Sequence, residues 1–175
     1  MAKNEFFQFY VEGEDEKKVI DTLKKDMKTI VSGKVDVLNV IQKEIKSPRI
    51  RTLKTGTNVI LVYDTDIERT DILEKNIRLL QSSKHIKRII CIPQVKNLEE
   101  ELVRATNVRR ALDILGSRSL ADFKRDLIKC TNLDRKLQER GFDMSKFWCK
   151  TPHNSFAKYG NDAELIKKLN GKKHI

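Results

Sequence analysis

The chain has 175 residues, 39% of them hydrophobic, which suits one domain with a continuous core and excludes a disordered polymer. Lysine and arginine (36) outnumber aspartate and glutamate (25), and the net charge of +11 favours nucleic acid as a partner, with an anionic membrane surface as second choice. No apolar run approaches the ~20 residues that span a bilayer, so no membrane span is expected.

The first elements in chain order are a strand, a helix and a second strand. Residues 5–11 (EFFQFYV) predict a strand that stops at the acidic turn E-G-E-D-E. Residues 15–28 carry four apolar side chains on one helical stripe, and the alternating segment 35–41 (VDVLNVI) predicts the second strand. A basic connector, broken by proline and glycine, follows at 42–57.

Two further strands complete the predicted sheet. The continuous apolar run 58–63 (NVILVY) is typical of a strand covered on both faces, and it stops at D-T-D. A helix fits residues 67–83, and 86–92 (IKRIICI) predict the fourth strand. Strands separated by helix-length crossovers indicate an α/β fold, a Rossmann-like four-stranded parallel sheet flanked by helices.

After Pro93 the sequence predicts helices alone, the last of them at 161–169. The expected organisation is therefore an α/β core at 1–95 and a helical extension packed on it at 96–175. Three widely spaced cysteines without a C-x-x-C pair give no zinc signature and indicate reduced thiols. Together with an amino terminus that lacks a signal-peptide pattern, they predict a cytoplasmic protein.

Acidic residues follow two of the predicted strands. Glu12 comes directly after the first strand and Asp64 directly after the third, with Asp66 two residues further on. In a doubly wound sheet these two strands are neighbours, so the carboxylates would meet at the crevice where such sheets bind ligands. Glu16, one helical turn after Glu12, could point to the same place. Carboxylates this close repel one another unless a cation neutralises them, and oxygen ligands suit Mg²⁺ or Mn²⁺.

Simpler roles for the same acids stay open. Residues 14–16 could be first-turn acids that the helix dipole favours. Asp66 could be the N-cap of the helix that follows. The coincidence of two acidic groups at adjacent strand ends, in an otherwise basic protein, favours the metal site.

At these residues the chain resembles the Toprim domain, in which an apolar strand ends in Glu-Gly and a later apolar strand ends in D-x-D. Here the motifs stand as FYVEGEDEKKVI and VILVYDTD, within about the first 95 residues. The additional Glu16, in E-G-x-x-E, is most similar to the OLD-family type of Toprim nuclease. The resemblance implies a Toprim-like form of the predicted sheet and a nuclease that hydrolyses phosphodiester bonds in DNA or RNA.

The resemblance also implies roles for individual residues. Glu12, Asp64 and Asp66 take the positions of catalytic metal ligands, and Glu16 that of a ligand to a second ion. Two Mg²⁺ or Mn²⁺ ions are implied, one activating water and the other stabilising the leaving oxygen. Glu99, after the fourth predicted strand, would complete the second site, unless residues 99–101 are merely first-turn acids.

A nuclease also needs cations that hold its substrate. Candidates in the predicted extension are Lys124, Arg125, Lys129, Arg135 and Lys136, which otherwise form solvated helix faces. In the aromatic-rich segment 147–161, Lys158 is the candidate catalytic lysine, although such a segment can equally anchor a loop to the core.

The leading hypothesis is therefore a metal-dependent Toprim-type nuclease that binds nucleic acid. The alternative is a non-catalytic or regulatory Toprim subunit of a larger nucleic-acid-processing or phage-defence complex, working with a partner ATPase. A third reading is a basic α/β binding domain whose acids only cap helices. Self-association into a homo-oligomer and the choice between DNA and RNA stay open.

Overall fold

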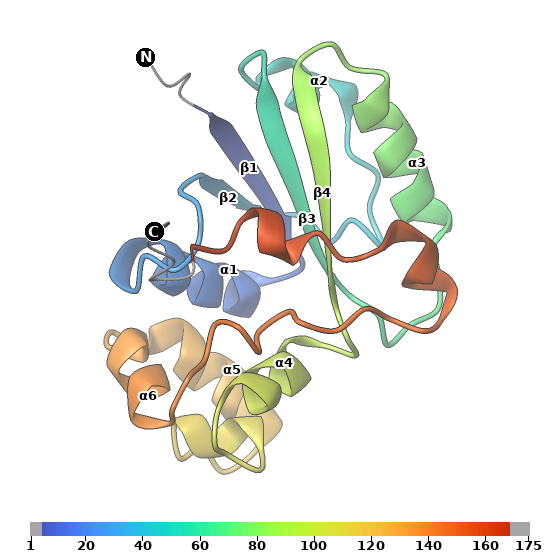
Figure 1. The fold of residues 1–175 in the computed structure, drawn as a ribbon. Helices are drawn as coiled ribbons and strands as arrows, with labels where there is room; N and C mark the ends of the chain where they lie inside the picture. Colours follow the sequence, from blue (N-terminus) through green and yellow to red (C-terminus); the bar gives the residue numbers. More distant parts are fainter. Residues whose placement is uncertain (1–4, 169–175) are drawn as a thin grey trace, which may run out of the picture.

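The computed structural model describes residues 5–168, which form an α/β fold around a four-stranded, all-parallel sheet (Figure 1). The strands are β1 (Phe6–Val11), β2 (Lys34–Val37), β3 (Thr57–Asp64) and β4 (Ile86–Gln94), in the order β2-β1-β3-β4. The predicted Rossmann-like sheet flanked by helices is confirmed. Because β1 and β3 are neighbours, their carboxyl ends lie side by side.

The helices fall into two sets, one in each half of the chain. Those of the first half are α1 (Glu14–Asp21), which continues into a π-helical turn (Thr22–Asp26), α2 (Ser47–Arg51) and α3 (Asp71–Gln81). Those of the second half are α4 (Leu98–Ala105), α5 (Leu120–Lys129) and α6 (Leu133–Glu139), with 3-10 turns at Ala111–Ile114, Ser155–Tyr159 and Ala163–Leu165. Figure 1 shows α4, α5 and α6 gathered below the carboxyl ends of the strands. No helix within residues 5–168 has the length and apolar character that a membrane crossing requires.

The sheet is buried on both faces, as the unbroken apolar run of β3 predicts. Alternate side chains of a strand point to opposite faces. Ile60 and Val62 accordingly join an apolar cluster that includes α1 and the helices of the second half. Leu61 and Tyr63 join a second cluster, which includes α3 and Phe156. This packing holds the carboxyl end of β3 rigidly in the middle of the sheet.

The second half of the chain packs directly on the sheet. Phe123 of α5 and Leu137 of α6 are fully buried in the same cluster as Phe9 of β1. The last described segment then crosses β4 from the side of α3 toward α1 (Figure 1). There the backbone amide of Asp162 donates to the Cys91 carbonyl oxygen at 2.8 Å, and the Asp162 carboxylate accepts from the Cys91 amide at 3.1 Å. This contact occupies backbone groups that an edge strand would otherwise leave open.

Several element boundaries differ from the sequence prediction. The second strand ends at Val37 because the Asn39 side chain accepts hydrogen bonds from the amides of Ile41 and Gln42, which turns the chain. The basic connector contains the short helix α2, with Pro48 in its first turn. The helix expected from residue 67 begins at Asp71.

The final helix expected at 161–169 is a single 3-10 turn, Ala163–Leu165, and residue 169 lies outside the described residues. The Asn161 side chain accepts from the Ala163 amide and donates to the carbonyl oxygens of Trp148 and Lys150. These bonds pin the segment to the loop before it, so tertiary contacts rather than helical periodicity decide its path.

Candidate functional site

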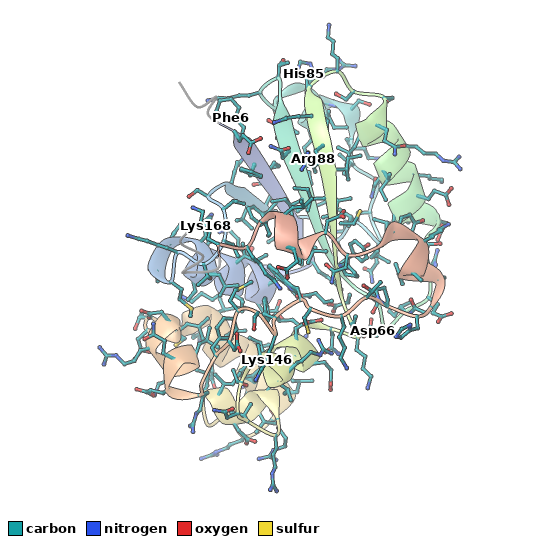
Figure 2. The ribbon with its side chains drawn as sticks, viewed as in Figure 1. Phe6, Asp66, His85, Arg88, Lys146 and Lys168 are labelled. Carbon is teal, nitrogen blue, oxygen red and sulfur yellow. The ribbon has the colours of Figure 1, made fainter. Side chains whose placement is uncertain are left out.

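The carboxyl ends of β1 and β3 bring acidic residues from distant parts of the sequence together. Tyr10 pairs in register with Leu61, so Glu12, which follows β1, lies level with Tyr63 and one residue from Asp64. Neighbouring strands are ~4.8 Å apart. Figure 2 places Asp66 at this end of the sheet, whereas Arg88 and His85 lie toward the amino end.

Mutual repulsion and burial mark Asp64 as the centre of this acidic group. Burial, together with the charges of Glu12, Asp66 and Glu99, raises the pKa of Asp64 to about 8, although a hydrogen bond from Gln94 opposes the shift. Burial also raises the pKa of Glu12, with the charges of Asp66 and Asp15 adding to it. Carboxyl groups that shift one another in this way share one small, poorly solvated space.

Glu16 reaches the same space from α1. Glu16 is only 5% exposed, and burial, with the charges of Asp15 and Asp64, raises its pKa to about 9. Among residues 5–168, its Oε2 atom has no hydrogen-bond partner. A buried, unsatisfied carboxylate oxygen is costly, and a bound cation is one way to satisfy it.

Gly13 leaves room for these carboxylates. Its backbone is extended, with φ −146°, so any residue could adopt that conformation. A Cβ atom there, however, would lie 2.7 Å from Asp15 Oδ1 and 3.1 Å from Glu16 Oε2. The glycine of the Glu-Gly pair thus lets two acidic side chains fold back over the backbone.

Glu99 and Lys124 enter the acidic group from the second half of the chain. Glu99 lies in the first turn of α4, and the Lys124 ammonium of α5 is 3.1 Å from Glu99 Oε1 and 3.7 Å from Asp15 Oδ2. Burial acts to lower the pKa of Lys124, but the negative charges of Glu99, Asp15 and Glu16 outweigh it and raise the pKa overall. Of the candidate cations in the extension, Lys124 is thus placed at the acids.

The simpler roles for the acids hold in part. Glu14, Asp15 and Glu16 do occupy the first turn of α1, and Glu14 is exposed as a dipole-favoured acid would be. Asp66 does not cap the following helix, because Thr70 holds the N-cap position of α3. Helix capping therefore explains neither the burial of Glu16 nor the position of Asp66.

Gln94 and Trp148 support Asp64 and were not anticipated from the sequence. The Gln94 Nε2 atom donates to Asp64 Oδ1 at 2.7 Å, and its Oε1 atom accepts from Trp148 Nε1 at 3.3 Å. Because an indole N–H can only donate, this contact fixes the orientation of the amide and turns its NH₂ group toward Asp64. The sequence signal for Gln94 is its position at the end of β4, at the same carboxyl-terminal edge of the sheet as Asp64.

Thr65, between the two acids of D-x-D, points into the protein. Its hydroxyl donates to the Gln94 carbonyl oxygen and accepts from the Lys96 amide, and its carbonyl oxygen accepts from the Asn154 side chain at 2.8 Å. Thr65 is thereby anchored between Asp64, which ends β3, and Asp66, which is exposed in the bend that follows.

Glu101 has a structural role that its position in an acidic run conceals. It is fully buried, accepts from the backbone amides of Val95 and Trp148 at 2.9 Å each, and pairs with Arg104 at 2.7 Å. It thereby ties the loop after β4 to Trp148, whose backbone has a positive φ of 53°. Glu101 is more than a first-turn acid, because it holds the support of Asp64 in place.

The other candidate cations lie apart from the acids or elsewhere on the surface. Lys158 is exposed and pairs with Glu74 of α3 at 3.4 Å, and within residues 5–168 no hydrogen bond or ion pair joins it to the acidic group. Arg125 pairs with Asp122, and Lys136 with Glu139 at 3.8 Å. Lys129 and Arg135 are exposed.

An open groove adjoins the D-x-D turn. Its volume is about 420 Å³, and it is lined by Thr65, Glu68, Val95, Lys96, Pro152, His153 and Asn154. A second cavity of similar volume lies at the amino-terminal edge of the sheet, near Phe6 and Lys54, and contains none of the acidic group. The groove at Thr65 thus offers a ligand a route to the D-x-D turn.

The acidic group fits a hard divalent cation by its chemistry. Glu12, Glu16, Asp64 and Asp66 offer carboxylate oxygens, the ligands that Mg²⁺ and Mn²⁺ prefer, and the buried Oε2 atom of Glu16 is free to accept an ion. Within the described residues, no three Asp, Glu, His or Cys side chains already enclose a metal position. Binding therefore requires these repelling side chains to rotate inward.

Comparison with models of known protein families gives no match, and searches against curated proteins and solved structures give none either.

Proposed function

We propose that this protein is a metal-dependent nuclease of the Toprim type, which hydrolyses phosphodiester bonds in DNA or RNA with Mg²⁺ or Mn²⁺. The observation that carries the proposal is the meeting of Glu12, Glu16 and Asp64 at one edge of the sheet, buried enough to raise the pKa of each. The net charge of +11 supports a polyanionic substrate.

Each acid has a role in this proposal. Asp64 and Asp66 bind the ion, and Glu12, whose pKa is raised, binds it or accepts a proton at the phosphate. A bound divalent ion would supply Lewis-acid activation of the phosphoryl group and neutralise the charge that develops on it. Gln94 holds the Asp64 side chain in orientation, and Thr65 is anchored between the two acids.

The substrate would be held by charge from the groove and the extension. Lys96 and His153 line the groove beside Thr65, and Lys129 and Arg135 are exposed on α5 and α6. Contacts of this kind are independent of base sequence and weaken with salt.

The test is cleavage of end-labelled single-stranded RNA, single-stranded DNA and duplex DNA by the purified protein with Mg²⁺ or Mn²⁺, and with a chelator as control. We expect cleavage of at least one substrate that depends on the metal and weakens as salt rises. Metal binding without cleavage of any substrate would instead favour the regulatory subunit. The absence of both metal binding and cleavage would favour a basic α/β binding domain whose acids only cap helices.

Replacing Gln94 with leucine tests the support of Asp64. The change removes the donor to Asp64 and leaves the buried Trp148 N–H without its acceptor. We expect Mn²⁺ affinity to fall about 10-fold or more, as for other residues that orient a metal ligand. Calorimetric titration with Mn²⁺ measures it, and Gln81→Leu, at an exposed position in α3, is the control. Equal affinity in wild type and Gln94→Leu would show that this hydrogen bond does not orient the ligand.

A further inference from the structure

The acids at the sheet edge fall into two groups according to the charges that face them. Glu12, Asp64 and Asp66 take part in no ion pair with any Lys, Arg or His among residues 5–168. Asp15 and Glu99 face the Lys124 ammonium at 3.7 Å and 3.1 Å, and the charge of Glu16 also acts on Lys124. The charge of Lys124 also acts to lower the pKa of Glu12, but within residues 5–168 its ammonium contacts Asp15 and Glu99 only, so the first group has no cation in direct contact.

The fold holds Lys124 in this place. Phe123, the preceding residue, is fully buried, and so is Leu127 one turn later, so both fix the orientation of α5 against the core. α5 packs against α1, the helix that carries Asp15 and Glu16. The side chain of Lys124 is 49% exposed, which leaves its ammonium reachable by solvent yet directed at the acids. The neighbouring Arg125 turns away and pairs with Asp122 of its own helix.

An ammonium and a divalent ion compete for the same carboxylates. The single charge of the ammonium and the double charge of the metal ion, held within a few ångströms of each other, would repel strongly in a poorly solvated site. The buried Glu16 Oε2 atom, which has no hydrogen-bond partner among residues 5–168, shows that this half keeps an unused ligand oxygen. Lys124 therefore neutralises the second half without satisfying all of its oxygens.

We propose that Lys124 is a built-in cation that takes the place of a second divalent ion. The site then binds one Mg²⁺ or Mn²⁺, at Glu12, Asp64 and Asp66, and the position facing Asp15, Glu16 and Glu99 accepts an ion only when the lysine charge is removed. This inference rests on the proposed function, because it takes the first group of acids as a metal site. It departs from the two ions that the Toprim resemblance implies.

Mn²⁺ stoichiometry, measured by calorimetry and by electron paramagnetic resonance of free Mn²⁺ without nucleic acid, tests the proposal. We expect one Mn²⁺ per wild-type chain and two per chain in Lys124→Met, which keeps an apolar stem of similar length and removes the charge. The second ion should bind at least ~10-fold more tightly than any second ion in wild type. Lys124→Arg keeps the charge and should bind one ion. Lys146→Met, at an exposed position that pairs with Asp143 away from the acids, is the matched control and should also bind one.

The outcomes separate this inference from the proposed function. Two ions in wild type, or one in Lys124→Met, would overturn the role of Lys124 and leave the metal site standing. Binding of no ion by wild type and Lys124→Met alike would overturn both. If Lys124→Met fails to fold, as judged by circular dichroism, Lys124→Gln provides the same loss of charge with a polar end group, and the same stoichiometries decide the matter.

Discussion

Replacing Asp64 with asparagine is expected to reduce metal-dependent cleavage and Mn²⁺ affinity about 100-fold or more, the scale on which loss of a central electrostatic group acts. The substitution keeps the size of the side chain and removes its charge. Asp64 is the acid on which Glu12, Asp66 and Glu99 all act, so it lies at the centre of the group. The effect should therefore exceed that of Gln94→Leu, which changes only the orientation of Asp64.

Cleavage of the labelled nucleic acids and calorimetric Mn²⁺ titration measure the effect of Asp64→Asn. Asp71→Asn is the matched control, because Asp71 is exposed in the first turn of α3 and pairs with Arg69 at 3.7 Å, outside the acidic group. Unchanged metal affinity in Asp64→Asn would show that the strand-end acids do not form the metal site. Residual cleavage equal to that of wild type would point to a contaminating nuclease.

The second large effect is a loss of stability of the metal-free protein as the pH rises from 6 to 9. In the folded protein, burial and neighbouring charges raise the pKa of Asp64 to about 8, and burial raises that of Glu16 to about 9, from ordinary values of 3.8 and 4.5. Between pH 5 and 9 the folded protein therefore holds protons that the unfolded chain has already released. Stability falls with pH wherever the folded state binds more protons, and it stops falling above the folded pKa values.

Groups with lowered pKa values do not alter this slope. Asp21, whose pKa hydrogen bonds from Lys17 and Lys24 reduce to about 2 against the effect of burial, is ionised in both states throughout the window. The window from pH 6 to 8 therefore reports mainly the buried acids at the sheet edge, and near pH 9 the Cys91 thiol, whose pKa burial raises to about 12, adds to the loss.

Thermal unfolding in a chelator, followed by circular dichroism at pH 6, 7, 8 and 9, measures this loss. We expect Tm to fall by about 5 °C or more across the range, a change of a few kcal/mol for a chain of this size. Asp64→Asn and Glu16→Gln should flatten the curve and raise Tm at pH 9, whereas Glu14→Gln, at an exposed position, should not. A Tm that is constant or rises from pH 6 to 9 would contradict the burial of these acids. Added Mn²⁺ should restore most stability at pH 9, because it binds the ionised carboxylates.

The strands and the strand-end acids could be predicted because their signal is local. The run NVILVY is apolar without interruption, and Asp64 follows it directly, so the pattern places both a buried strand and a charged end. The parallel order then follows from helix-length crossovers, which leave few arrangements of the sheet. The second strand was predicted too long because Asn39 ends it through side-chain bonds rather than through a change in hydrophobic pattern.

The parts of the site that escaped prediction depend on contacts across long separations in sequence. Trp148 lies 54 residues from Gln94 and 47 from Glu101, and no periodicity relates them. Glu101 and Glu99 stand in one acidic run, yet one is fully buried in a structural network and the other faces Lys124. The sequence does not distinguish Lys158 from Lys124 as a lysine of the site. The packing of α5 directs Lys124 to the acids, whereas Lys158 pairs with Glu74.

By itself, the sequence determined the class of fold and the edge of the sheet at which the acids gather, because hydrophobic periodicity and strand termination are properties of neighbouring residues. The tertiary structure alone decided which acids are buried, which cation faces them and what orients Asp64. Burial and charge interaction depend on distances between atoms that the chain brings together only when it folds, and in a poorly solvated space a few ångströms decide whether a carboxyl group keeps its proton.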